Sequence, residues 1–250
     1  EILGLGSGSM PLAFRFSPVI GGALYWLRPG TVRLPPWPDR VPLTAGSRRT
    51  ILDVGLYAAV LAVGLFLLLS EGEVGQMDRS TIALLLGLLV LLGLRDKIPF
   101  LAARPEVYGL FLIVSLFPDE TWIVGWQLVM VCIWWGAAAS KLNHHFPYVI
   151  SVMVSNTPWN RSRKMKAMLY RDWPNDVRPS RHAEFAAHLG TAWEFGWPFV
   201  LLVSDGGTIG TIAVIAMVLF HVHITSTFAL GVPLEWNLFM IFGLLFLFGE

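Results

Sequence analysis

Charged side chains are scarce in this sequence. Aspartate, glutamate, lysine and arginine together make up 14% of its 250 residues, while hydrophobic residues make up 55%. A soluble domain carries about 25% charged residues, and the mean hydropathy of +0.62 departs from such a domain in the same direction. The composition excludes an ordinary soluble domain and predicts a protein that crosses the membrane several times.

Cysteine is almost absent as well. Cys132 is the only one, and it lies within a long apolar run, which excludes an internal disulfide and a cysteine-based zinc site. Basic and acidic residues nearly balance, at a formal net charge of +1. Nothing in this balance supports nucleic-acid binding, so we expect membrane lipids, and no nucleic acid, as partners.

Residues 1–50 lack any long apolar run. Glycine, proline and arginine recur there at short intervals, and the prolines of Leu34–Pro42 remove backbone donors that a helix needs. The segment Gly21–Leu27, which contains a Tyr-Trp pair, is predicted as a short interfacial segment. We expect residues 1–50 to form a loop region on the cytoplasmic side, followed by a transmembrane domain over residues 51–250.

Seven apolar stretches follow in the transmembrane domain, where one crossing needs about 20 residues. The expected spans are Ile51–Ser70, Thr81–Leu94, Val107–Phe117, Thr121–Ser140, Glu184–Ser204, Thr208–Ser226 and Leu234–Gly249. The second and third are short. Phe146–Val154 is apolar but too short to cross, and is predicted as a re-entrant or interfacial segment. The predicted fold is an all-α polytopic transmembrane bundle of about seven spans plus this segment.

The distribution of charge supports this order of spans. If Arg48 and Arg49 lie in the cytoplasm and the spans alternate, Arg79 is the only basic residue on the outer side. The acidic residues expected on that outer side are Glu71, Glu73, Asp78, Asp119, Glu120 and Asp205. Positively charged loops stay inside during insertion. The sequence therefore predicts an inner (plasma) membrane protein whose basic loops, above all residues 156–183, are cytoplasmic.

That basic loop leaves two interpretations open. Its charges from Arg161 to Lys166 are followed by Met168, Leu169, Tyr170 and Trp173. A basic segment next to apolar and aromatic side chains is typical of contact with an anionic leaflet. The same charges also serve topology alone.

Polar groups appear abruptly where the fourth span ends. The small residues Gly136–Ser140 are followed by Lys141, His144 and His145 before Pro147. On a continuing helix the three polar residues share one face. One interpretation is a lysine that snorkels to the headgroups, with the histidines bound there. The other is a catalytic set, in which a buried Lys141 acts as a base and His144 and His145 position or relay protons.

His221 and His223 lie toward the cytoplasmic end of the sixth span. Because residues two apart point to different sides of a helix, the pair is poorly placed to share one metal ion. Together with His188 they are the candidate ligands for a metal or haem site. We predict no metal, and the sequence identifies no cofactor.

Several other polar residues fall inside or beside the predicted spans. Glu194 lies midway along the fifth, Asp53 near the start of the first, and Glu235 and Asn237 at the start of the seventh. A carboxylate at such a depth usually faces the bundle interior. One polar cavity open to the cytoplasm explains the grouping, and separate ion pairs explain it equally well. In the first case the substrate-binding residues are Glu194, Glu235, Asn237, His221 and His223.

Four segments carry a resemblance to a known family. They are Tyr25–Gly30, Ser140–Tyr148, Arg178–Arg181 and Gly231–Asn237, the last reading Gly-Val-Pro-Leu-Glu-Trp-Asn. Over most of its length the chain resembles an uncharacterised family of actinobacterial multi-pass membrane proteins, a domain-of-unknown-function family. This resemblance implies a membrane protein and no particular activity.

A second, local resemblance concerns Ala137–Asn143, Ala-Ala-Ala-Ser-Lys-Leu-Asn. It is similar to the small-residue run followed by Lys-Leu-Asp/Asn in the vitamin K-dependent gamma-carboxylase-like (HTTM) membrane family. In that family the lysine deprotonates a reduced quinone, so the resemblance implies Lys141 as a base. The soluble lumenal part of that family has no counterpart in this sequence.

Two functions follow as expectations. The first is a membrane protein with a cytoplasmic-side Lys/His cavity that binds or acts on a lipid or quinone. The second is a non-catalytic accessory subunit of a larger membrane complex. A transporter ranks below both, because no internal repeat with paired broken helices is visible.

Overall fold

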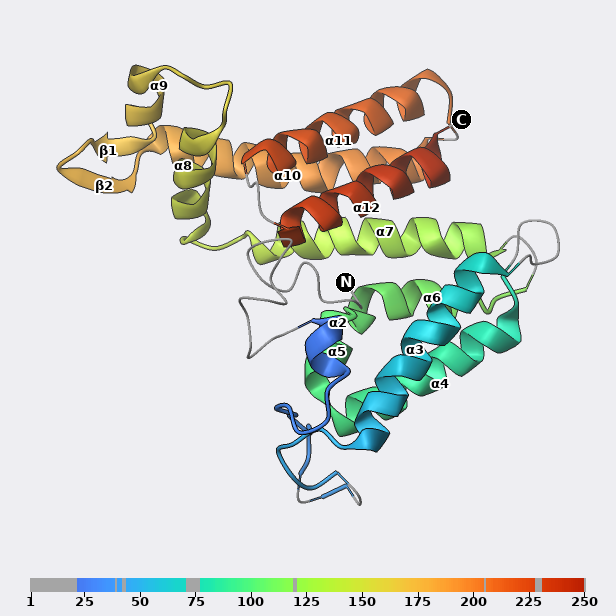
Figure 1. Cartoon of the computed structure of the whole chain (residues 1–250). Coiled ribbons are helices and arrows are strands. Elements are labelled where there is room, and N and C mark those ends of the chain that lie inside the picture. The colour runs from blue at the N-terminus through green and yellow to red at the C-terminus, as the bar shows by residue number, and fades with distance from the viewer. Residues whose placement is uncertain are drawn as a thin grey trace. The chain divides into compact units, whose positions relative to one another are not determined.

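The computed structural model describes residues 22–38, 40–41, 44–70, 77–118, 121–204, 206–227 and 231–249 (Figure 1). Of residues 231–233 only the backbone is described. The residues from the outer-side acidic set that lie outside the described part are Glu71, Glu73, Asp119, Glu120 and Asp205. The chain divides into two compact units, residues 1–126 with 230–232, and residues 127–229 with 233–250. The boundary expected at residue 50 stays a prediction.

The first unit is built on a helical hairpin. Its elements are α2 (Ala23–Trp26), α3 (Ile51–Leu69), α4 (Arg79–Arg95), α5 (Lys97–Ala102), the π-helical η1 (Pro105–Gly109), α6 (Leu110–Val114) and the first residues of α7 (Thr121–Ser140). In Figure 1, α3 and α4 lie side by side. Trp26 of α2 is fully buried against this hairpin, with its ring edge-on to Tyr57 at 5.5 Å.

Polar side chains set where the helices of the first unit begin. Thr50 and Asp53 form a reciprocal capping box at the start of α3. The carboxylates of Asp78 and Asp96 accept backbone N–H groups at the starts of α4 and α5. Each cap supplies an acceptor to N–H groups that have no partner inside the helix.

In the third expected span, Val107–Phe117, the helix begins two residues earlier than predicted, at Pro105, and ends three residues earlier, at Val114. Helical structure there is the pair η1 and α6, which ends at Val114. Arg104, with a left-handed φ of 49°, and the proline after it separate this helix from α5. A helix over Pro105–Val114 rises about 15 Å, half the thickness of a hydrocarbon core.

Three of the described helices, α3, α7 and α11, are long and apolar enough to cross a membrane by length and composition. Pro105–Val114, Phe146–Asn156 and Leu234–Phe248 are shorter apolar helices. The structure thus supports membrane insertion through several helices, while the seven-span arrangement stays a prediction.

The second unit is a helical bundle with a small cap. Its elements are the remainder of α7, α8 (Phe146–Asn156), α9 (Arg163–Ala167), β1 (Tyr170–Asp172), β2 (Asp176–Pro179), α10 (Arg181–Val203), α11 (Gly207–Thr227) and α12 (Gly231–Phe248). In Figure 1, α7, α10, α11 and α12 run side by side, and α8 lies across α10. The first half of α10 extends past the end of α7 toward α8 and the strands.

The basic segment 156–183, expected to be a loop, is largely ordered. It contains α9 and an antiparallel hairpin in which Tyr170 pairs with Pro179 and Asp172 with Asp176. The hairpin ends at Ser180, whose hydroxyl accepts the N–H groups of His182 and Ala183 and so caps α10. The segment therefore connects α8 to α10 as a folded cap.

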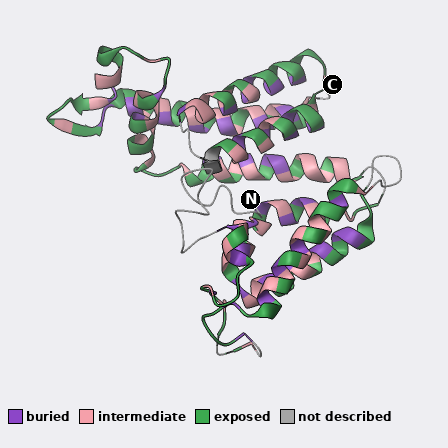
Figure 2. Cartoon of the chain, viewed as in Figure 1, coloured by how far each residue is buried: buried purple, intermediate pink, exposed green. Residues whose placement is uncertain are grey.

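Burial along the bundle helices follows a pattern expected in lipid. Figure 2 shows exposed residues along all of the long helices. Many of them are large and apolar, for example Leu68 and Leu69, which are 81% and 74% exposed. The interior of the second unit is filled by apolar and small residues, including Met130, Ala138 and Ala213. Extensive apolar surface on long helices is costly in water but not against lipid chains.

Candidate functional site

A turn after α7 positions Lys141. The helix ends at Ser140, and the backbone N–H of Lys141 donates to the carbonyl of Ala138 at 3.1 Å. The Asn143 amide donates to the carbonyl of Ser140 at 2.8 Å, while its oxygen accepts the N–H of His145 at 2.8 Å. One asparagine thus satisfies backbone groups at the end of α7 and the start of α8. Lys141, His144 and His145 would share a face on a continuing helix, but α7 ends at Ser140 before them.

Lys141 forms an ion pair with Glu194 of α10. Its Nζ donates to Oε2 of the carboxylate. The side chain of Glu194 is 5% exposed and that of Lys141 22%. The amine also lies over the ring of Phe146, with Nζ 5.7 Å from the ring centre. Glu194, midway along α10 in sequence, reaches Lys141 because α10 extends past the end of α7.

A second polar cluster joins three helices of the same bundle. His221 of α11, only 2% exposed, accepts a hydrogen bond from the indole N–H of Trp134 of α7 at 3.0 Å. Its other ring nitrogen lies 2.6 Å from the amide oxygen of Asn237 of α12, which is also buried. Two predicted site residues, His221 and Asn237, are therefore in direct contact.

The remaining predicted site residues are more dispersed. His144 and His145 are exposed, and their rings pack on each other with centres 3.7 Å apart. Within the described residues, neither ring makes a hydrogen bond. His223 and Glu235 are half-buried on α11 and α12. The structure brings together Lys141 with Glu194 and His221 with Asn237, but not the two histidines after Lys141.

The candidate metal ligands do not converge. His188 is exposed on α10, and both ring nitrogens of His221 are already used. In the part of the chain that the structure describes, no three His, Cys, Asp or Glu side chains lie close enough to hold a metal ion.

Asp53 belongs to a different cluster, inside the first unit. Its carboxylate accepts from Arg33 at 3.1 Å and from Arg95 at 2.6 Å. Beside it, Arg49 pairs with Asp96, which is fully buried and also accepts the backbone N–H of Leu34 at 3.2 Å. The second guanidinium nitrogen of Arg33 donates to the carbonyls of residues 44, 45 and 46. These ion pairs attach the segment from 31 to 49 to the hairpin of α3 and α4.

The partners of these groups are not marked in the sequence. Trp134 is one of many aromatic residues in apolar runs, and no pattern identifies it as the donor to His221. The charge pattern predicts only a topological role for Arg49 and Arg95. A usable signal was present for Arg95, because Arg95 and Asp96 end one apolar run as Asp53 begins another, which is how adjacent antiparallel spans bring opposite charges together.

Known proteins identify the family of this chain but give it no activity. No curated protein and no solved structure matches the chain. A family described as "Transmembrane protein of unknown function (DUF3556)" matches over residues 1–250. Because the match covers the whole sequence, and because the long apolar helices agree with its description, the chain belongs to this family of transmembrane proteins.

Proposed function

We propose that the chain is a multi-pass membrane protein that binds a lipid or a quinone against the Lys141–Glu194 ion pair, with Lys141 as proton acceptor. The observation that carries this proposal is the ion pair between buried Glu194 of α10 and partly exposed Lys141 at the end of α7. A buried ion pair stabilises a fold only slightly, because desolvation offsets most of the Coulomb attraction. Ionisable groups kept inside a membrane bundle are functional-site candidates for that reason.

The unequal exposure of the two side chains suits proton transfer. A ligand can approach the partly exposed amine of Lys141, while Glu194 is covered. The hydrogen bond gives the lysine proton an acceptor, and a lysine that has passed its proton to Glu194 is a neutral base. A hydroxyl of a reduced quinone or of a lipid headgroup, placed at Nζ, then transfers its proton to Lys141.

Other residues have supporting roles in this proposal. The ring of Phe146 offers an apolar face beside the amine. His223 and Glu235 orient the ligand headgroup, and the hydrogen bond between buried His221 and Asn237 holds the two helices that carry them together. His144 and His145, which are exposed beyond α7, exchange protons with water. The local similarity of Ala137–Asn143 to the gamma-carboxylase-like family supports the role of Lys141.

The proposal includes an orientation in the inner membrane. The end of the second unit that carries Lys141 also carries the folded cap, with basic residues at 161, 163, 164, 166, 171, 178 and 181. Positive charge at span ends favours the cytoplasmic side. We therefore place this end of the second unit, and the basic cap, in the cytoplasm.

The proposal can be tested by mass spectrometry of lipids and quinones that copurify with the protein in mild detergent. Lys141→Met alone is a poor variant, because it leaves Glu194 buried without its partner. The pair Lys141→Gln/Glu194→Gln removes both charges but keeps side chains that can hydrogen-bond. The swap Lys141→Glu/Glu194→Lys keeps an ion pair and moves the amine to α10.

We expect both double variants to fold, as checked by size-exclusion chromatography, and to lose a small molecule that copurifies with the wild-type protein. Retention of that molecule by the charge-swapped protein would contradict a specific role for Lys141. The accessory-subunit alternative makes a different prediction. It expects a stoichiometric protein partner in the wild-type sample, no bound lipid or quinone, and a complex that survives the swap.

A further inference from the structure

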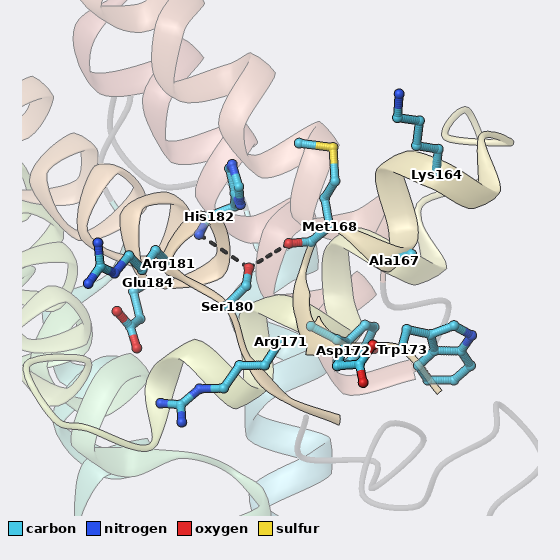
Figure 3. Close-up of a pocket in the computed structure, with 11 residues that line it drawn as sticks. Lys164, Ala167, Met168, Arg171, Asp172, Trp173, Ser180, Arg181, His182 and Glu184 are labelled. Atoms are coloured by element: carbon cyan, nitrogen blue, oxygen red, sulfur yellow. Dashed lines mark hydrogen bonds between the residues drawn. The ribbon is translucent and has the colours of Figure 1, made fainter. Parts of the chain in front are cut away.

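The folded cap of the second unit contains a cavity apart from the Lys141 cluster. It has a volume of about 780 Å³ and lies between α9, β1 and the start of α10 (Figure 3). Lys164 comes from α9, Arg171 from β1, and Arg181 with His182 from α10. Residues far apart in the segment thus line one cavity, with the charged ends of Lys164, Arg171 and Arg181 pointing in different directions in Figure 3.

The basic side chains of this cavity make no ion pair with a described acidic residue, and the charge of Arg171 acts on Asp176, whose pKa it helps to lower. No described acidic side chain lies within ion-pair distance of Lys164, Arg171 or Arg181. Arg171 makes one hydrogen bond, from Nε to the carbonyl of Pro179 at 3.3 Å. Asp172 and Glu184 also line the cavity but do not pair with these cations. The guanidinium groups are therefore available to an anion from outside.

Arg178, on the neighbouring strand, forms an ion pair within the cap. It donates to both carboxylate oxygens of Asp176, at 2.9 and 2.6 Å. Hydrogen bonds from Arg178 lower the pKa of Asp176 to about 2. Arg178 does not line the cavity. Arg171, on the other strand of the same hairpin, has no such pair, although both arginines belong to one short hairpin.

Apolar and aromatic side chains surround the basic groups. Trp173 and Met168, at the cavity wall, are 56% and 44% exposed, and Trp159 and Met165 nearby in the cap are also exposed. Tryptophan beside lysine and arginine is typical of the headgroup level of a membrane. The short apolar helix α8 lies across α10 (Figure 1).

We propose that this cavity binds a phosphate group carried by the headgroup of an anionic phospholipid. Arginine presents a planar fork of donors that matches phosphate oxygens. The site depends on side chains, since the hydroxyl of Ser180 already accepts the first free N–H groups of α10. Trp173 and Met168 contact the glycerol and upper acyl part of the lipid. This site is independent of Lys141 and of the proposed base chemistry.

The test uses the full chain in mild detergent and measures binding of short-chain phosphatidylglycerol. Phosphatidylcholine with the same chains is the zwitterionic control, and glycerol 3-phosphate and inorganic phosphate are the soluble probes. The variant Arg171→Gln/Arg181→Gln removes two charges from the cavity. The matched control Arg161→Gln/Arg163→Gln removes two charges from exposed positions of the same cap that do not line the cavity.

We expect the cavity variant to bind phosphatidylglycerol at least about tenfold more weakly, since each charge-assisted hydrogen bond contributes about a factor of ten. The matched control should change binding much less. Equal weakening in both variants overturns the proposal, because it indicates attraction by net charge alone. If glycerol 3-phosphate binds as tightly as the lipid, the phosphate site stands and the lipid as its source is overturned.

Discussion

The indole N–H of Trp134 donates to Nε2 of His221, and this contact determines the protonation of the imidazole. An indole nitrogen only donates, so Nε2 carries no proton. The proton of the neutral ring lies on Nδ1, which donates to the amide oxygen of Asn237 over 2.6 Å. One neutral histidine therefore links α7, α11 and α12 through both of its ring nitrogens.

Replacing this histidine should destabilise the bundle. His221→Leu removes the hydrogen bonds of the imidazole with Trp134 and Asn237. It leaves the buried indole N–H of Trp134 without an acceptor, at a cost of about 1–3 kcal/mol for that group. We expect a lower unfolding temperature in mild detergent. His223→Leu, a half-buried position on the same helix, is the control and should change little. Imidazole ¹⁵N shifts should show a proton on Nδ1 of His221; a doubly protonated ring contradicts the assignment.

The buried pair of Arg49 and Asp96 should hold the segment from 31 to 49 on the first unit. Asp96→Asn keeps an acceptor for the N–H of Leu34 but leaves Arg49 buried without a counter-charge. Breaking a buried pair in this way costs about 3–5 kcal/mol. We expect faster trypsin cleavage between residues 31 and 49.

The control for that experiment is Glu106→Gln, since Glu106 is 58% exposed and pairs with Arg104 at the surface. An exposed pair contributes only about 0–1 kcal/mol, so cleavage should stay at the wild-type rate. If Asp96→Asn also leaves cleavage unchanged, the ion pair does not hold the segment.

Close packing of α12 on α7 depends on Gly243. A Cβ atom added there lies 2.7 Å from Cε and 3.2 Å from Sδ of Met130, a fully buried residue. Because Met130 is fully buried, its flexible end can move aside only by displacing its neighbours. Gly243→Val should for that reason destabilise the second unit by about 1–3 kcal/mol, measured by thermal unfolding in detergent. At Gly136, on α7, an added Cβ meets nothing within 4 Å. Equal losses for Gly243→Val and Gly136→Val contradict this packing argument.

The proposed orientation can be measured with the single native cysteine removed. In a Cys132→Ser background, Arg161→Cys reports on the basic cap and Thr208→Cys on the start of α11, and both positions are exposed. We expect a membrane-impermeant maleimide to label the residue 208 thiol from outside intact cells and the residue 161 thiol only in inverted vesicles. The opposite pattern reverses the topology.

Helix positions were accessible from the sequence because apolar runs and their polar boundaries are local properties. The run Thr121–Ser140 coincides with α7, and Thr208–Ser226 lies within one residue of α11 at each end. Phe146–Val154, too short to cross, is the helix α8, which ends at Asn156. The strands β1 and β2 in the polar segment after it could not be predicted, because they are short and have no strong alternating pattern.

Contacts between elements could not be predicted from the sequence in the same way. Composition alone placed this chain in the membrane, and the charge pattern alone proposed its orientation. Only the tertiary structure showed that Asn143 ends the helix before His144, that α10 extends far enough to bring Glu194 to Lys141, and that Trp134 meets His221. Hydropathy depends on each residue and its neighbours in the chain, whereas these contacts depend on how far each helix extends and which face it turns to the next helix.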